Sequence, residues 1–148
     1  MIVPRRRLLL SASAAMFAGM PRAGATTRQV ADLIATIAAG ATPKVGRIKL
    51  DVPVIVENGN TVAMTVSIPG KIAGPERLQS IYVFAEGNPL PNVAAFHFGP
   101  RAGAPRIATR IRLATSQTVI ALAKYDDGSC WTDTVELLVT LAACIDGV

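Results

Sequence analysis

Apolar and polar residues alternate with a period of two along most of the chain from about Val45 to Leu141. The alternating stretches are residues 48–52, 62–68, 81–85, 107–113 and 135–141, and shorter apolar runs occupy residues 54–56, 93–98 and 118–123. Turn-forming residues cluster between them at residues 57–60, 87–91, 99–105 and 126–129. Short, regularly spaced strands of this kind predict an all-β fold, an antiparallel β-sandwich of seven to eight strands.

One short helix is predicted ahead of the strands. Its apolar residues recur at the helical spacing i, i+3, i+4, i+7, and they are Val30, Leu33, Ile34 and Ile37. Thr26 or Thr27 provides the N-cap, and Gly40 with Pro43 ends the helix. Because a helix of this length is unstable alone, we expect it to dock on the sandwich.

The first 25 residues have the composition of an export signal. Three arginines at residues 5–7 precede an apolar run at residues 8–20 and the small-x-small cleavage pattern Ala23-Gly24-Ala25. The run is shorter than the roughly 20 apolar residues of a transmembrane helix, and the paired arginines favour the twin-arginine route. We therefore expect export to the periplasm, with a signal peptide at residues 1–25, a sandwich at residues 26–141 and a C-terminal arm at residues 142–148.

Most of the positive charge of the chain lies in this leader. The chain has 15 Lys and Arg against 10 Asp and Glu, and four of the arginines, but no acidic residue, fall within residues 1–25. The mature chain therefore keeps 11 basic residues against 10 acidic ones and is nearly neutral. This balance gives no reason to expect binding to nucleic acid or to a membrane surface.

Two cysteines, Cys130 and Cys144, remain in the mature chain. Two cysteines in an oxidising compartment pair by default. The last predicted strand, residues 132–141, lies between these two and spans roughly 33 Å when extended, whereas a disulfide needs Cα atoms within about 7 Å. A tail of three residues cannot fold back over that length, so we expect no intrachain disulfide. Cys130 is expected to fill a small apolar space beside an aromatic residue; an intermolecular bond or a redox role toward a bent-back tail are the alternatives.

The sequence has no phosphate-binding loop, no metal-spaced His/Cys cluster and no nucleophile elbow. The single histidine, His97, is expected to be a strand histidine at a surface or an interface. Arg110 and Arg112 project from the face opposite Ile111 and Leu113, where they either attract an anionic substrate or acidic partner, or form a solvated strand face. We therefore predict a protein that is not an enzyme and that has no cofactor and no metal.

Cys144 is the candidate functional residue because of its position. It follows the last predicted strand and precedes only four residues, and segments this close to a terminus are usually mobile. A mobile thiol suits a carrier that holds a substrate covalently while partner enzymes do the chemistry. Asp146 nearby disfavours the thiolate, which fits a passenger better than a self-activated nucleophile. The alternatives are a buried or incidental cysteine and an intermolecular disulfide.

Four segments in order along the chain resemble the SoxY family, the sulfur-carrier subunit of the periplasmic thiosulfate-oxidising system. These segments are Pro53-Val54-Ile55-Val56-Glu57-Asn58-Gly59, Ala85-Glu86-Gly87-Asn88-Pro89-Leu90-Pro91, Thr109-Arg110-Ile111-Arg112-Leu113-Ala114 and Val139-Thr140-Leu141-Ala142-Ala143-Cys144. The resemblance implies an immunoglobulin-like sandwich that forms a heterodimer with a SoxZ-like subunit. It also implies that a swinging arm carries a small anionic or thiol-bound cargo on Cys144 to periplasmic oxidising enzymes.

The arm departs from the pattern that this family usually shows. SoxY typically ends Gly-Gly-Cys-Gly-Gly, whereas this chain reads Ala142-Ala143-Cys144-Ile145-Asp146-Gly147. Alanine is stiffer than glycine, and Ile145 is both β-branched and bulky. The ending resembles a SoxY-related subgroup whose arm reads Ala-Ala-Cys-Ile-Glu, which implies a different cargo or different partner enzymes. The alternative function is a non-catalytic protein-protein interaction module of the same fold, in which both cysteines are incidental.

Overall fold

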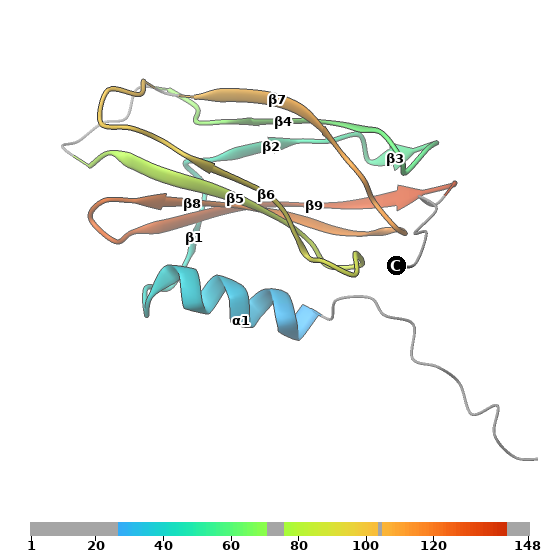
Figure 1. Cartoon of the computed structure of the whole chain (residues 1–148), viewed down its shortest axis with the longest axis horizontal. Coiled ribbons are helices and arrows are strands. Elements are labelled where there is room, and N and C mark those ends of the chain that lie inside the picture. Colours follow the sequence, from blue (N-terminus) through green and yellow to red (C-terminus); the bar gives the residue numbers. More distant parts are fainter. Residues whose placement is uncertain (1–26, 71–75, 104, 142–148) are drawn as a thin grey trace, which may run out of the picture.

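The computed structural model describes residues 27–70, 76–103 and 105–141. The predicted signal peptide, residues 1–25, lies outside the described residues, and so does the predicted arm with Ala142, Ala143, Cys144, Ile145, Asp146 and Gly147. Within the described ranges, one helix precedes nine strands (Figure 1). They are α1 (Thr27–Ala38), β1 (Lys44–Val45), β2 (Lys49–Asp51), β3 (Ile55–Val56), β4 (Val62–Ser67), β5 (Leu78–Ala85), β6 (Asn92–His97), β7 (Arg106–Ile111), β8 (Gln117–Tyr125) and β9 (Cys130–Val139).

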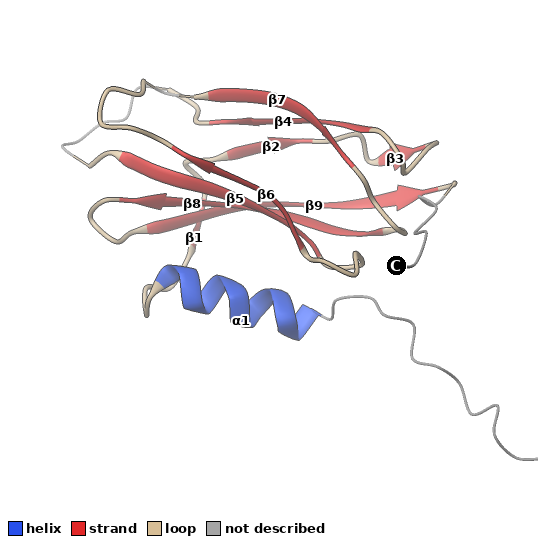
Figure 2. Ribbon diagram, viewed as in Figure 1, coloured by secondary structure: helices blue, strands red, loops and turns tan. Residues whose placement is uncertain are grey.

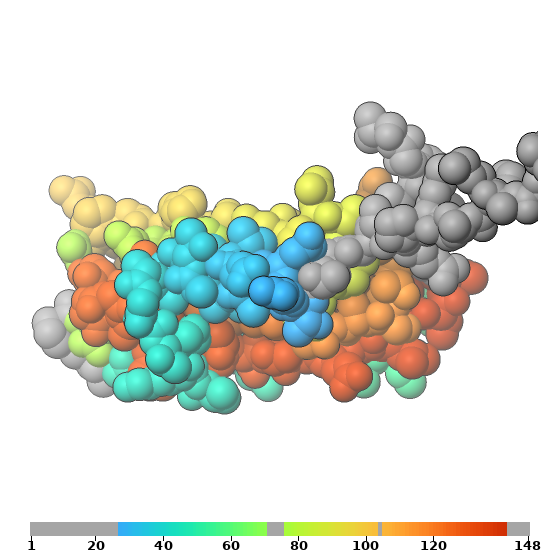
Figure 3. Space-filling model, turned by 90° about the horizontal axis from the view of Figure 1, so that it is seen from below, coloured from blue at the N-terminus to red at the C-terminus, as the bar shows by residue number. Residues whose placement is uncertain are grey.

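The strands form two sheets that pack face to face, and the helix lies on the outer face of the larger one. The larger sheet has the order β1-β9-β8-β5-β6, with β3 also paired to β9, and the smaller sheet has the order β2-β4-β7. Figures 1 and 2 show the resulting three layers, and Figure 3 shows α1 lying along the outer face of the larger sheet. The predicted all-β, immunoglobulin-like sandwich preceded by one short helix is confirmed.

The alternating apolar residues of the strands fill the space between the two sheets. Along β4 the inward-facing Val62, Met64 and Val66 are all buried, while the residues between them are more exposed. The facing positions of β5 and β8 supply further apolar side chains to the same core, and they include Ile81, Val83, Val119 and Ala121. The long strands β4, β5 and β8 thus bury one face against the opposite sheet, as their period of two predicts, whereas both residues of β1 are exposed.

The strand beyond the expected seven to eight is β1, whereas β3 lies within the predicted apolar run at residues 54–56; each of these two strands has two residues. Both pair with β9 in the parallel sense, so the larger sheet is not purely antiparallel. Between them the chain crosses to the smaller sheet as β2. Gly46, with φ of +114°, and Arg47, with φ of +54°, make that change of direction. The Arg47 side chain lies over the Trp131 ring at 5.0 Å and pairs with Glu76 at 3.0 Å, which stabilises an unusual backbone conformation.

Helix α1 buries a second, smaller cluster on the outer face of the larger sheet. Val30 and Ala38 pack with Phe84, Leu122 and Cys130. The Lys124 ammonium group donates a hydrogen bond of 2.8 Å to the Ile37 carbonyl, which satisfies a free acceptor in the last turn of the helix. The predicted helix and its docking are therefore confirmed.

Gly87 is the position where the fold leaves no room for a larger residue. A Cβ atom there would lie 2.7 Å from Thr115 Cγ2 and 3.1 Å from Gln117 Cβ, whereas a Cβ atom at Gly99 would meet nothing within 4 Å. We expect Gly87→Ala to lower the free energy of unfolding by about 1–3 kcal/mol because of overpacking. The matched control Gly99→Ala should stay within about 0.5 kcal/mol of wild type. Urea unfolding followed by Trp131 fluorescence measures both, and equal midpoints for the two variants would contradict the packing described.

Candidate functional site

The described chain ends at Leu141, and the residues just before it are held on both sides. On one side, Leu138 N donates to Val54 O at 2.8 Å and Thr140 N donates to Val56 O at 2.9 Å. On the other side, Val139 N donates to the Ser116 hydroxyl at 2.9 Å. Hydrogen bonds therefore hold the end of β9 and Thr140 in place, shortly before the described part of the chain ends at Leu141.

Gly59 fixes the last described residue itself. Its N–H donates to Leu141 O at 2.8 Å, and its carbonyl accepts from Leu113 N at 2.8 Å. The predicted turn at residues 57–60 is thus confirmed and also joins the end of β9 to the loop after β7. The pattern of turn residues predicts the turn, but nothing in the sequence indicates its bond to Leu141.

The buried side-chain amides of Asn88 and Gln117 form hydrogen bonds with the loops at this same end of the sandwich. Asn88 Nδ2 donates to Arg112 O at 2.8 Å, and Asn88 Oδ1 accepts from Ala114 N at 2.9 Å. Gln117 Nε2 donates to Asn88 Oδ1 at 3.0 Å, and Gln117 Oε1 accepts from Gly87 N at 2.7 Å. Sequence reasoning missed this network, because a lone Asn and a lone Gln far apart in the sequence carry no signal that they meet. The network holds the backbone on either side of Leu113, the residue whose N–H donates to Gly59.

Cys130 lies at the opposite end of β9. Its side chain is 2 % exposed and packs against Val30, Ala38, Phe84 and Leu122. Its thiol is free, and its pKa is raised because burial disfavours the thiolate, an effect that the nearby Lys124 charge opposes. The prediction that Cys130 fills a small apolar space beside an aromatic residue is therefore confirmed.

The length of β9 also bears on the expected absence of an intrachain disulfide. Cys130 and Leu141 are eleven residues apart along a strand and its extension, which corresponds to roughly 36 Å. Cys144 follows Leu141 by three residues, so its Cα lies at most about 11 Å from that of Leu141. The remaining separation from Cys130 is far greater than the roughly 7 Å that a disulfide permits. While β9 is folded, the two thiols cannot pair within one chain.

His97 lies at the same end of the larger sheet as Cys130. The strand register places His97, Ser80, Lys124 and Cys130 next to one another across β6, β5, β8 and β9. Three strand spacings separate His97 from Cys130, or roughly 14 Å, so the histidine is too far away to act as its base. The exposed His97 ring instead forms a T-shaped contact with the Tyr82 ring, with ring centroids 5.8 Å apart. His97 is a strand histidine at the surface, as predicted.

Arg110 and Arg112 are exposed, while Ile111 and Leu113 between and after them are buried. Arg110 lies opposite Ala63 on the outer face of the smaller sheet, and Arg106 lies opposite Ser67 on the same face. The predicted orientation of the arginines is correct. The choice between a solvated face and an anion-attracting face stays open.

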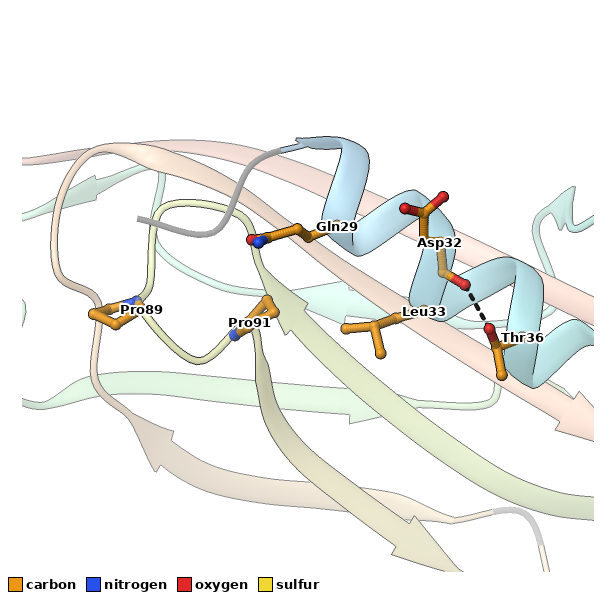
Figure 4. Close-up of a pocket in the computed structure, with 6 residues that line it drawn as sticks. All are labelled: Gln29, Asp32, Leu33, Thr36, Pro89 and Pro91. Carbon is orange, nitrogen blue, oxygen red and sulfur yellow. Dashed lines mark hydrogen bonds between the residues drawn. The ribbon is translucent and has the colours of Figure 1, made fainter. Parts of the chain in front are cut away.

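A shallow groove of about 380 Å³ runs between α1 and the turn after β5 (Figure 4). Its lining residues are Gln29, Asp32, Leu33, Thr36, Pro89 and Pro91. Figure 4 shows Gln29 and Leu33 extending from the helix toward the two prolines. No cysteine or histidine lines this groove, so it does not contain the candidate chemistry.

Among residues 27–70, 76–103 and 105–141, no group of three or more His, Cys, Asp or Glu side chains is placed to hold a metal ion. None of the helices in that part of the chain is long and apolar enough to cross a membrane.

Fold and site together define a β-sandwich protein whose C-terminal cysteine follows an anchored strand end. The model of the family "Sulfur oxidation protein SoxY" matches residues 34–144, which are most of the chain. The chain belongs to the SoxY family. No curated protein sequence matches it.

Solved structures agree with this assignment. The sulfur carrier protein SoxY from Chlorobium limicola f thiosulfatophilum is 28% identical, with a TM-score of 0.63 over 78% of this chain and 100% of its own. A superoxide reductase (neelaredoxin) from Ignicoccus hospitalis is 18% identical, with a TM-score of 0.55 over 65% of this chain and 82% of its own. A putative superoxide reductase from Thermotoga maritima is 21% identical, with a TM-score of 0.53 over 66% and 87%. The two reductases share the fold alone, whereas the family match and the SoxY structure support a sulfur-carrier role.

The environment of Cys130 predicts an unreactive thiol. Burial and a raised pKa both reduce the exposed thiolate that reacts with alkylating agents. We expect iodoacetamide to modify Cys130 at pH 8 at least tenfold more slowly in the native protein than in denaturant. Peptide mass spectrometry of a Cys144→Ser variant measures this rate without interference from the second thiol. Equal rates in the folded and unfolded protein would show that Cys130 is not packed under α1.

Proposed function

We propose that this protein is a periplasmic carrier that holds a sulfur-containing or other small intermediate covalently on the Cys144 thiol. Partner enzymes load and unload the cargo, and a SoxZ-like subunit forms a heterodimer with the sandwich. The observation that carries the proposal is the family match, which runs from residue 34 to residue 144 and so includes the C-terminal cysteine.

The two ends of β9 support a division of roles between the cysteines. Cys130 is buried beneath α1, so its sulfur is not accessible to a partner protein. Leu141 is exposed at the other end and anchored through Gly59, three residues before Cys144. An anchored base gives a short arm a defined point of departure, so that its thiol reaches a partner's pocket without unfolding the sandwich.

The described residues also favour a passenger thiol over a self-sufficient thiol enzyme. A catalytic cysteine needs a base or another device that promotes its thiolate. The single histidine, His97, lies at the same end of the larger sheet as Cys130. That end is roughly 36 Å from Leu141, measured along β9 from Cys130. The activating chemistry is therefore expected to come from partner enzymes.

The composition of the arm bears on the cargo. Ala142, Ala143 and Ile145 give this arm a larger cross-section than an all-glycine arm would have. We propose that its partner enzymes have wider channels, and that the cargo or the enzymes differ from those of the thiosulfate-oxidising system.

A matched pair of serine variants tests the carrier role. Extract from the native host lacking this protein is supplied with purified wild type, Cys144→Ser or Cys130→Ser, and oxidation of added reduced sulfur compounds is followed by oxygen uptake. We expect Cys144→Ser to abolish the uptake that depends on this protein and Cys130→Ser to retain most of it. Full activity of Cys144→Ser would exclude the carrier role and favour the interaction module instead.

A further inference from the structure

Four exposed apolar residues lie on or directly beside β3 and the end of β9. Val54 is 62% exposed, Ile55 67%, Leu138 57% and Leu141 67%. Ile55 and Leu138 are register partners, and the Val54 carbonyl accepts a hydrogen bond from Leu138 N. We call these four residues the arm-root cluster, because the segment with Cys144 begins directly after Leu141.

Single exposed hydrophobic residues are common on protein surfaces, but a group of them marks an interaction site. The other large hydrophobic residues that are exposed in the described chain lie apart from this group, on α1, on β1 and in the turn after β5: Leu33, Val45 and Leu90. Val45 is a useful contrast, since β1 pairs with the opposite end of β9 near Thr132. Exposed apolar surface is therefore concentrated at the end of β9 from which the thiol-bearing segment departs.

Only two residues separate Leu141 from Cys144. This short connection limits which part of a partner enzyme can cover the cluster while the enzyme receives the Cys144 thiol. The Cα of Cys144 lies at most about 11 Å from that of Leu141, whatever path the chain takes. An enzyme that receives the thiol in a pocket must therefore bring the rim of that pocket over the residues around Leu141. The arm cannot reach into a pocket while the sandwich stays clear of the enzyme.

The size of the cluster favours a transient contact. A stable protein interface uses about 20–30 residues on each side, whereas this cluster has four large apolar side chains, that of Leu141 included. A weak contact also suits a carrier that has to leave one enzyme for the next.

We propose that the arm-root cluster is the docking surface for the enzyme that loads Cys144, and that the rim of this enzyme's pocket is apolar. The inference rests on the proposed carrier function. Docking places the apolar rim on Ile55 and Leu138 and holds the thiol at the mouth of the pocket.

Charged substitutions at the cluster test this proposal. Ile55→Asp and Leu138→Asp are compared with wild type and with the control Val45→Asp, whose side chain is 85% exposed at the other end of β9. Each purified protein is added to native-host extract lacking the wild-type chain, and loading of Cys144 is followed by intact-mass spectrometry. The rate of alkylation by iodoacetamide reports on the thiol itself. We expect loading at least tenfold slower for Ile55→Asp and Leu138→Asp, wild-type loading for Val45→Asp, and equal alkylation of Cys144 in all four proteins.

The outcomes separate the docking surface from the carrier function. If wild type is never loaded, the proposed function fails. If wild type and both cluster variants load equally fast, only the docking proposal fails. Faster alkylation of Cys144 in the cluster variants would show that residues 142–148 cover the cluster. Loss of a stable complex with another subunit on size exclusion would show that the cluster is a permanent subunit contact. Either result overturns the proposal. If aspartate weakens the β3–β9 pairing, Ile55→Ser and Leu138→Ser carry the same expectation.

Discussion

The pairing of β9 is the constraint on which the rest of the molecule depends. This strand pairs with β8 from Cys130 to Leu137, and β1 and β3 pair with its opposite edge at its two ends. An extended strand fixed in this way keeps its two ends roughly 30 Å apart. Cys130 begins the strand and is buried there, whereas the segment that contains Cys144 begins after the other end of the strand.

The two ends differ in what they expose. At the first end, α1 covers Cys130 and the Lys124 side chain closes the last turn of the helix. At the second end, Gly59 holds Leu141 in place while Ile55 and Leu138 stay open to solvent. One end is therefore buried under the helix and the other exposes apolar side chains, a difference that fits the proposed carrier role.

Sequence patterns predict most of the fold but few of the contacts at the candidate site. Periodicity of two and turn composition predict the long strands, and the helical spacing predicts α1. The parallel pairing of β1 and β3 was missed, since two residues are too few to show a period and the pairing depends on where the chain crosses between sheets. The bonds of Asn88 and Gly59 were missed for a related reason, because their partners are distant in sequence. The packing of Cys130 and the orientation of Arg110 were predicted correctly, since both follow from local composition and alternation.

A covalent cargo on the thiol of Cys144, as proposed above, would change the mass of the native protein. The protein is isolated from its own cells during growth on reduced sulfur compounds, and its intact mass is measured before and after treatment with a reductant. We expect an added mass that fragmentation places on Cys144 and that the reductant removes. An unmodified Cys144 under every growth condition would contradict it.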